Sequence, residues 1–196
     1  MREYYGAVET LGSRMQQGWR ARVLRQLSPR PSGPGAGMPS LSWIGQERIA
    51  IGSVPPPESV AGLASQGVTH VVNCRAHGQV WLRGDLAAEQ AVFGVARVAH
   101  APMQDLGLRQ RPRLWAEAAC FAARVLEDQP QARVLVHCTA GRRRSPMLAY
   151  AVLRLRGRTA EEAAALVLKY RTEAQLVPAY VHSVEQWLAR ERAAAS

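Results

Sequence analysis

The sequence predicts an α/β fold, in which helices pack around a central sheet. Apolar runs of strand length alternate with stretches of helical periodicity between about residues 48 and 137. From about residue 145 onward the chain shows helical patterns only. Strands that alternate with helices are typical of a sheet covered by helices, whereas separate blocks of either element indicate other fold classes.

Four segments have the composition of strands. The segment 48–53 alternates between the two faces of a strand, and 68–73 is an apolar run suited to a buried strand. Segments 95–100 and 133–137 have the same character, and each follows a predicted helix. We therefore expect all four in the central sheet.

Six segments are predicted to be helices: 57–66, 85–93, 112–127, 145–156, 160–172 and 178–193. Pro57, Pro112 and Pro178 stand at helix starts, where the missing proline N–H is not needed. Thr159 and Glu162 have the spacing of a capping box at the start of the fifth helix.

Residues 1–38 differ in composition from residues 39–196, which we expect to form the main domain. A Pro/Gly-rich linker ends this first part, and ahead of it arginines alternate with apolar residues at helical spacing: Val8, Leu11, Met15, Trp19, Val23 and Leu27. The pattern predicts a basic amphipathic helix. It would pack on the main domain or on a partner chain, dock on an anionic membrane surface, or form a disordered or partner-binding arm.

Length and composition limit the class of protein and its expected compartment. The chain has 196 residues, enough for one domain with a core and an extension. Its 3 cysteines are too few for a disulfide scaffold or a zinc site. Neither a transmembrane run nor a secretory signal is visible, so we expect a cytoplasmic protein.

The net charge of +10 favours an anionic partner. Lys169 is the only lysine, and the heavy use of Arg, Ala and Gly is typical of a GC-rich bacterial genome. The arginines are spread along the chain without a nucleic-acid module, so no nucleic-acid partner is expected.

The most informative segment is 134–146, VLVHCTAGRRRSP. An apolar strand ends in His137 and Cys138, a tight loop follows, and a helix begins near Ser145. Main-chain N–H groups of such a loop and the dipole of the following helix form an anion site. Arg144 adds a guanidinium that matches two oxyanion oxygens. Because these positive groups stabilise a thiolate, we expect Cys138 to be a nucleophile.

Five residues separate Cys138 from Arg144, and the segment resembles the Cys-x5-Arg signature of the dual-specificity branch of the protein tyrosine phosphatases. His137, Gly141 and Ser145 also match that pattern. The resemblance covers roughly residues 42–190 and implies a sheet of four or five mostly parallel strands. A structural cysteine beside solvated arginines is the alternative, but it accounts for neither Gly141 nor the strand-loop-helix context.

The resemblance implies a role for each part of the loop. Cys138 attacks the phosphorus, Arg144 binds the equatorial oxygens, and the Ser145 hydroxyl helps the cysteine leave. His137 orients the loop, whose remaining positions are Thr139, Ala140, Gly141, Arg142 and Arg143. No metal and no cofactor is implied.

A general acid must protonate the leaving oxygen. The family takes an Asp from an upstream loop, and Asp105 in APMQDLG matches in order and context. A turn-forming Asp is the alternative interpretation. Asp85 is the second candidate, although its position is that of a helix N-cap.

The arginines of the loop and a second cysteine bear on the substrate and on redox control. Arg142 and Arg143 either favour highly charged substrates or are solvated residues that hold the loop. Cys74 ends a predicted strand, and some relatives carry a second cysteine there that traps the oxidised nucleophile as a disulfide. A small core residue is an equal interpretation of Cys74.

The leading hypothesis is metal-free hydrolysis of phosphomonoesters through a phosphocysteine. Phosphoproteins carrying phosphotyrosine and phosphoserine or phosphothreonine are the expected substrates, with phosphoinositides or other non-protein phosphomonoesters second. A catalytically inactive phosphate-binding module and a rhodanese-type sulfur carrier are the alternatives from other classes. The retained Cys138, Arg144, Ser145 and Asp105 favour the enzyme over both.

Overall fold

The computed structural model describes residues 41–195, and the helix and linker predicted for 1–38 lie outside them. The described chain contains one mixed sheet in the order β1-β2-β5-β3-β4. Its strands are β1 (Leu41–Trp43), β2 (Ile49–Ser53), β3 (His70–Asn73), β4 (Val98–His100) and β5 (Val134–Cys138). β1 pairs antiparallel with β2, and the other neighbours run parallel, which confirms the predicted mostly parallel sheet.

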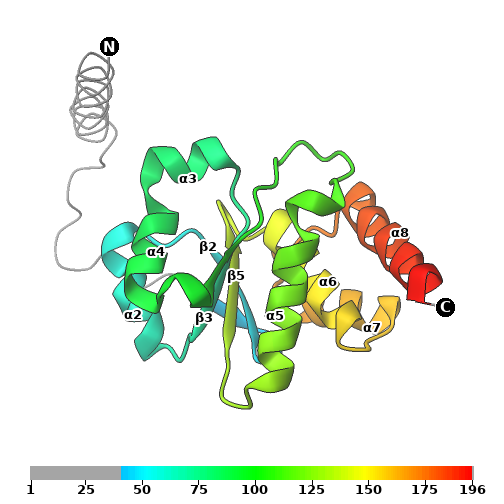
Figure 1. The fold of residues 1–196 in the computed structure, drawn as a ribbon, viewed down its shortest axis with the longest axis horizontal. Coiled ribbons are helices and arrows are strands. Elements are labelled where there is room, and N and C mark those ends of the chain that lie inside the picture. The colour runs from blue at the N-terminus through cyan, green and yellow to red at the C-terminus, as the bar shows by residue number, and fades with distance from the viewer. Residues whose placement is uncertain (1–40, 196) are drawn as a thin grey trace, which may run out of the picture. The chain divides into compact units, whose positions relative to one another are not determined.

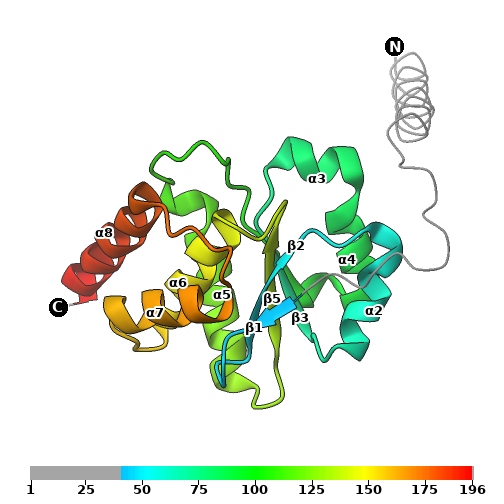
Figure 2. The ribbon, with the colours of Figure 1, turned by 180° about the vertical axis from the view of Figure 1, so that it is seen from behind.

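Helices cover both faces of this sheet (Figures 1 and 2). One group consists of α2 (Val60–Ser65), α3 (His77–Arg83) and α4 (Asp85–Phe93). The other consists of α5 (Ala116–Asp128), α6 (Arg144–Leu155), α7 (Ala160–Tyr170) and α8 (Pro178–Ala195). Among residues 41–195, no helix is long and apolar enough to span a membrane.

Strand β5 shows how the sheet orients the two residues at its end. Val134 and Val136 belong to the core under α5 and α6, whereas Leu135 belongs to the smaller core under α2 and α4. Successive side chains of a strand point to opposite faces. His137 therefore faces the α4 side, and Cys138 faces the side of α6.

Several predicted boundaries were wrong. The predicted helices at 57–66 and 112–127 begin with separate 3₁₀ turns, Pro57–Ser59 and Pro112–Leu114, before α2 and α5. The first half of the predicted strand 95–100 is a 3₁₀ turn, Val95–Arg97, which follows Gly94 at a φ of 84°. Its alternating apolar residues find no strand partner until β4 begins.

Two elements were not predicted, β1 and α3. β1 has three residues and exists because its backbone pairs with β2. α3 buries only Val80 and has no apolar stripe that its sequence would reveal. By contrast, α4 has its predicted bounds, Pro178 begins α8, and the capping box of Thr159 and Glu162 is formed at α7.

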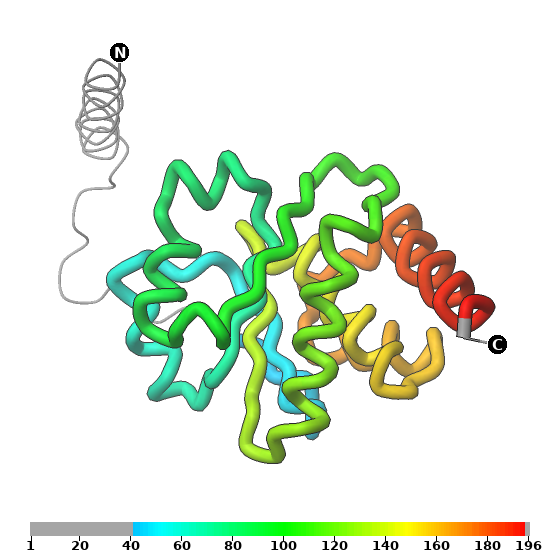
Figure 3. Tube along the Cα trace, viewed as in Figure 1, coloured from blue at the N-terminus to red at the C-terminus, as the bar shows by residue number. Residues whose placement is uncertain are grey.

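The Cα trace shows where the functional loops gather (Figure 3). The loop after β5, helix α3 after β3 and the segment 101–111 after β4 all rise from the carboxyl end of the parallel strands. Ligands of open α/β sheets bind at this end of the strands.

Candidate active site

The loop between β5 and α6 is fixed at its tightest point by Gly141. Its φ is 69°, and an added Cβ would lie 2.7 Å from the Gly52 carbonyl oxygen. Arg171 holds the loop from outside, because its Nε donates to the Gly141 carbonyl at 3.3 Å and its Nη2 to the Ala140 carbonyl at 3.4 Å. Only glycine fits this position, and the main chain of the loop is thereby held in a single arrangement.

Cys138 lies at the floor of this loop with 2% of its surface exposed. The Ser145 hydroxyl donates to its sulfur at 3.3 Å. Burial alone would raise the pKa of the thiol, but the hydroxyl and main-chain N–H of Ser145, the Arg144 guanidinium and the Gly141 N–H lower it to about 7. About half of the thiol is then ionised at neutral pH, which gives a reactive thiolate.

His137 points away from the loop mouth and is fully buried. Its Nε2 lies 2.7 Å from Oε1 of Glu89, a buried residue of α4. Burial alone would lower the pKa of His137, but the Glu89 carboxylate raises it above its usual value. The buried Glu89 carboxylate therefore favours the protonated form of the imidazole beside the nucleophile.

A buried polar network extends from Glu89 behind the loop. The Asn73 amide donates to Glu89 at 3.1 Å and to Asp85 at 2.8 Å. Asp85 also forms an ion pair with Arg75 at 2.5 Å. All of these side chains are buried, so the network satisfies charges that would otherwise be costly to bury.

This network excludes Asp85 as the general acid. Its side chain is fully buried and is committed to Arg75 and Asn73. The N-cap prediction was also wrong, because Gly84 caps α4 and Asp85 is the first helical residue.

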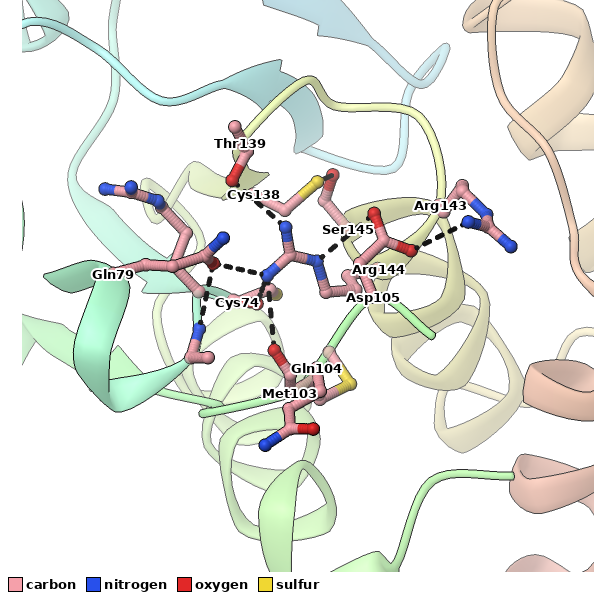
Figure 4. Close-up of polar contacts among 12 residues, drawn as sticks. Cys74, Gln79, Met103, Gln104, Asp105, Cys138, Thr139, Arg143, Arg144 and Ser145 are labelled. Carbon is pink, nitrogen blue, oxygen red and sulfur yellow. Dashed lines mark hydrogen bonds and ion pairs between the residues drawn. The ribbon is translucent and has the colours of Figure 1, made fainter. Parts of the chain in front are cut away.

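Arg144 is buried across the loop from Cys138 (Figure 4). Its Nη1 donates to the Gln79 side-chain oxygen at 2.8 Å and to the Met103 carbonyl at 3.2 Å, and its Nη2 donates to the Thr139 hydroxyl at 3.0 Å. Its Nε has no hydrogen-bond partner among the described residues, although Asp105 Oδ2 lies 3.7 Å away. The guanidinium is thus pre-positioned and keeps donor capacity toward the mouth.

Asp105 lies above the same loop with its side chain 34% exposed. The Tyr180 hydroxyl donates to its Oδ1 at 3.2 Å. Arg143 Nη1 lies 3.2 Å from the same oxygen (Figure 4). Arg143 therefore holds Asp105 over the mouth. Of the two adjacent arginines, only Arg142 is exposed, and its carbonyl accepts from the Gln175 N–H at 2.7 Å.

The structure brings the predicted residues together at one place. Cys138, Arg144 and Ser145 are in mutual contact range, Asp105 is above them, and His137 supports the strand end from behind. Cys74 directly follows the neighbouring strand β3 and is buried, and its N–H donates to the carbonyl of His137, the residue before Cys138. Among residues 41–195, no group of three His, Cys, Asp or Glu side chains is arranged to hold a metal ion.

Sequence reasoning missed four supporting residues: Gln79, Glu89, Arg171 and Tyr180. Each lies far from residue 138 in the chain and on a helix or at its end. None of the four has a signal in a single sequence. The burial of Glu89 is visible only in the structure, where the buried residues of α4 are Asp85 and Glu89 themselves.

The order of the sheet and the loop at the end of β5 define the class of fold, that of the cysteine-dependent phosphatases. The resemblance to the dual-specificity branch found in the sequence is supported by solved structures of this class. No protein-family model and no curated protein matches the chain.

Three solved structures illustrate the likeness. Tk-PTP in its active form has a TM-score of 0.63 and 22% identity, and the match covers 76% of this chain and 97% of that one. Kinase associated phosphatase has a TM-score of 0.66 and 16% identity, with 82% and 99% covered. PTPMT1 in complex with PI(5)P has a TM-score of 0.64 and 19% identity, with 76% and 96% covered. At these identities the likeness concerns the fold alone.

Proposed function

We propose that this protein hydrolyses phosphomonoesters through a phosphocysteine intermediate, without a metal, and acts chiefly on phosphorylated proteins. The observation that carries the proposal is the convergence of a low-pKa thiol, Cys138, with Arg144, Ser145 and Asp105. A nucleophile, an oxyanion binder and an acid within one loop cluster are the parts that phosphoryl transfer needs.

In the first step the Cys138 thiolate attacks phosphorus, and the bond from phosphorus to the ester oxygen breaks. Arg144 and the loop N–H groups bind the three equatorial oxygens. Asp105, protonated, gives its proton to the leaving oxygen, so that the alcohol or phenol departs neutral. The product on the protein is phosphocysteine.

In the second step water attacks phosphorus, and the Asp105 carboxylate takes its proton. The phosphorus–sulfur bond breaks, and inorganic phosphate leaves. The Ser145 hydroxyl, 3.3 Å from the sulfur, stabilises the departing thiolate by donating to it. The site returns to its starting protonation.

One observation supports protein substrates of mixed type. Thr139 and Ala140 are exposed at the loop mouth, so the phosphate site lies near the surface. A shallow site admits short phosphoserine and phosphothreonine as well as phosphotyrosine. We place this activity in the cytosol, where thiols stay reduced.

A second candidate is hydrolysis of phosphoinositides or other non-protein phosphomonoesters. It is favoured by the exposed Arg142 in the loop and by the structural likeness to PTPMT1, which was solved in complex with PI(5)P. Phosphate release from a panel of phosphopeptides and phosphoinositide vesicles ranks the two candidates.

The decisive test is Cys138→Ser. Phosphate release should be abolished, while inorganic phosphate still binds, because the loop N–H groups and Arg144 remain. Cys120→Ser, on α5 and remote from the loop, is the matched control and should keep full activity. Residual turnover in Cys138→Ser, or strong inhibition of the wild type by a chelator, would overturn the mechanism.

A further inference from the structure

A second cationic pocket lies beside the proposed catalytic site, between residues 109–112 and α8. It has a volume of about 180 Å³, and its lining includes Arg109, Arg111, Ser183, Gln186, Trp187 and Arg190. Both ribbon views place the segment after β4 next to the start of α8 (Figures 1 and 2). The proposed mechanism uses none of these side chains.

Three of the lining residues are arginines without a counter-charge. Arg109, Arg111 and Arg190 are exposed, and none forms an ion pair or side-chain hydrogen bond with another of the residues 41–195. α8 carries two acidic residues. Glu185 pairs with Arg154 at 2.7 Å, and Glu191 forms an ion pair with none of these three arginines. Three like charges around one cavity repel each other, and an anionic group bound there relieves that repulsion.

The walls of the pocket are held in place by contacts that do not use the arginines. The Ser183 hydroxyl accepts from the Gln110 N–H at 2.9 Å, and the Gln110 amide donates to the Gln104 carbonyl at 3.1 Å. Trp187 packs edge-to-face on the buried Trp115 with ring centroids 5.2 Å apart. A ligand therefore meets a preformed cavity and orders only the arginine side chains.

The same helix connects this pocket to the proposed catalytic site. Tyr180 donates to Asp105, and one turn later Ser183 accepts from Gln110. With a rise of about 1.5 Å per residue, Gln186 lies roughly 9 Å and Arg190 roughly 15 Å beyond Tyr180 along α8. An extended peptide covers this span in about three to five residues at roughly 3.3 Å each.

The chain between the two sites presents apolar side chains to solvent. Leu106 and Leu108 are each 65% exposed, and they lie between Asp105 and Arg109 in sequence. Together with the distance, this surface fits a peptide that lies along the loop and ends in an acidic group.

We propose that this pocket binds an acidic side chain of the substrate, a second phosphorylated residue or a carboxylate, about three to five residues from the phosphorylated residue. The proposal rests on the proposed function, because it places that residue at Cys138. Binding in this pocket makes the protein selective for phosphopeptides that carry an acidic residue at a fixed distance from the phosphorylated residue.

The test compares two phosphopeptides that differ only in the residue at that distance from the phosphorylated residue. The acidic peptide carries a second phosphorylated residue or Glu there, and the other carries Ala. Arg111→Gln and Arg190→Gln should each lower kcat/KM for the acidic peptide about tenfold, the size expected for a lost charge-assisted hydrogen bond. Turnover of the Ala peptide and of p-nitrophenyl phosphate should stay within about twofold. Arg113→Gln, exposed in the adjoining 3₁₀ turn but outside the pocket lining, is the matched control and should behave as wild type.

The outcomes are distinguishable. Equal losses for both peptides, or equal losses in Arg113→Gln, would show that only the overall charge matters and would overturn the pocket. If the wild type prefers phosphoinositide vesicles to the acidic peptide and Arg190→Gln removes that preference, the occupant of the pocket is not a peptide. If the wild type fails to hydrolyse p-nitrophenyl phosphate, the proposed function fails. The pocket is then tested by binding alone. The peptide with two phosphorylated residues should bind the double variant Cys138→Ser/Arg190→Gln more weakly than it binds Cys138→Ser, and equal binding would overturn the pocket.

Discussion

Cys74 and Cys138 stand side by side at the ends of adjacent parallel strands. Asn73 of β3 pairs with His137 of β5, and the Cys74 N–H donates to the His137 carbonyl at 2.7 Å. Neighbouring strands lie about 4.8 Å apart, which is within the Cα range of about 4.4–6.8 Å for a disulfide. Burial, followed by the nearby Cys138, raises the pKa of the Cys74 thiol well above its usual value.

This relationship predicts reversible oxidation. Mild peroxide should convert the Cys138 thiolate to a sulfenic acid, and Cys74 should then condense with it to a disulfide and release water. Activity should return on addition of a thiol. In Cys74→Ser the sulfenic acid is not trapped, and a second equivalent of peroxide oxidises it to the sulfinic acid, which thiols do not reduce. The loss should therefore become irreversible, measured as phosphate release after reduction, whereas Cys120→Ser should recover like the wild type. Full recovery in Cys74→Ser would leave Cys74 as a core residue only.

Asp105→Asn tests the acid role. The variant should slow hydrolysis of alkyl phosphates by roughly 10²–10⁴-fold, because the poor leaving group needs a proton. An aryl phosphate with a good leaving group should lose much less in a single-turnover assay. Tyr180→Phe removes the hydrogen bond to Asp105 and should give a smaller loss of the same kind. Equal losses for both leaving groups would remove Asp105 from this role.

The pKa of Cys138, about 7, sets the pH dependence of thiol alkylation. Because the thiolate is the reactive form, the alkylation rate should rise tenfold per pH unit below 7 and level off above it. Ser145→Ala removes a hydrogen bond that lowers this pKa, so its alkylation midpoint should move to higher pH. Rates of iodoacetamide alkylation against pH, measured on both proteins, provide the check. An unchanged midpoint would contradict the assigned cause.

Glu89→Gln tests the carboxylate behind His137. The His137 pKa should fall, because burial then acts without the Glu89 charge, and the protonated imidazole that favours the Cys138 thiolate becomes less populated. Asp85, Arg75 and Asn73 remain in the network.

The expected result is a Cys138 alkylation midpoint shifted to higher pH, with kcat/KM at pH 6 reduced. Glu117→Gln, an exposed residue of α5, is the control and should leave the midpoint unchanged. A lowered unfolding temperature without a shift of the midpoint would make Glu89 a purely structural residue.

The sequence alone determined the parts of the protein whose signals are local. Strand β5, the loop after it and the start of α6 lie within one continuous segment, so Cys138, Arg144 and Ser145 could be assigned from spacing. The capping box at Thr159 is likewise a short-range pattern. Asp105 was found because its loop follows a strand and is bounded by Pro and Gly.

The tertiary structure alone decided which distant side chains support that loop. Glu89 reaches His137, Gln79 reaches Arg144 and Arg171 reaches Gly141 because the fold packs α4, α3 and the end of α7 against one strand end. It also removed Asp85 from the acid role by burying it against Arg75. Local periodicity encodes which face of an element is apolar, but which polar groups meet across elements depends on the register and packing of the whole chain.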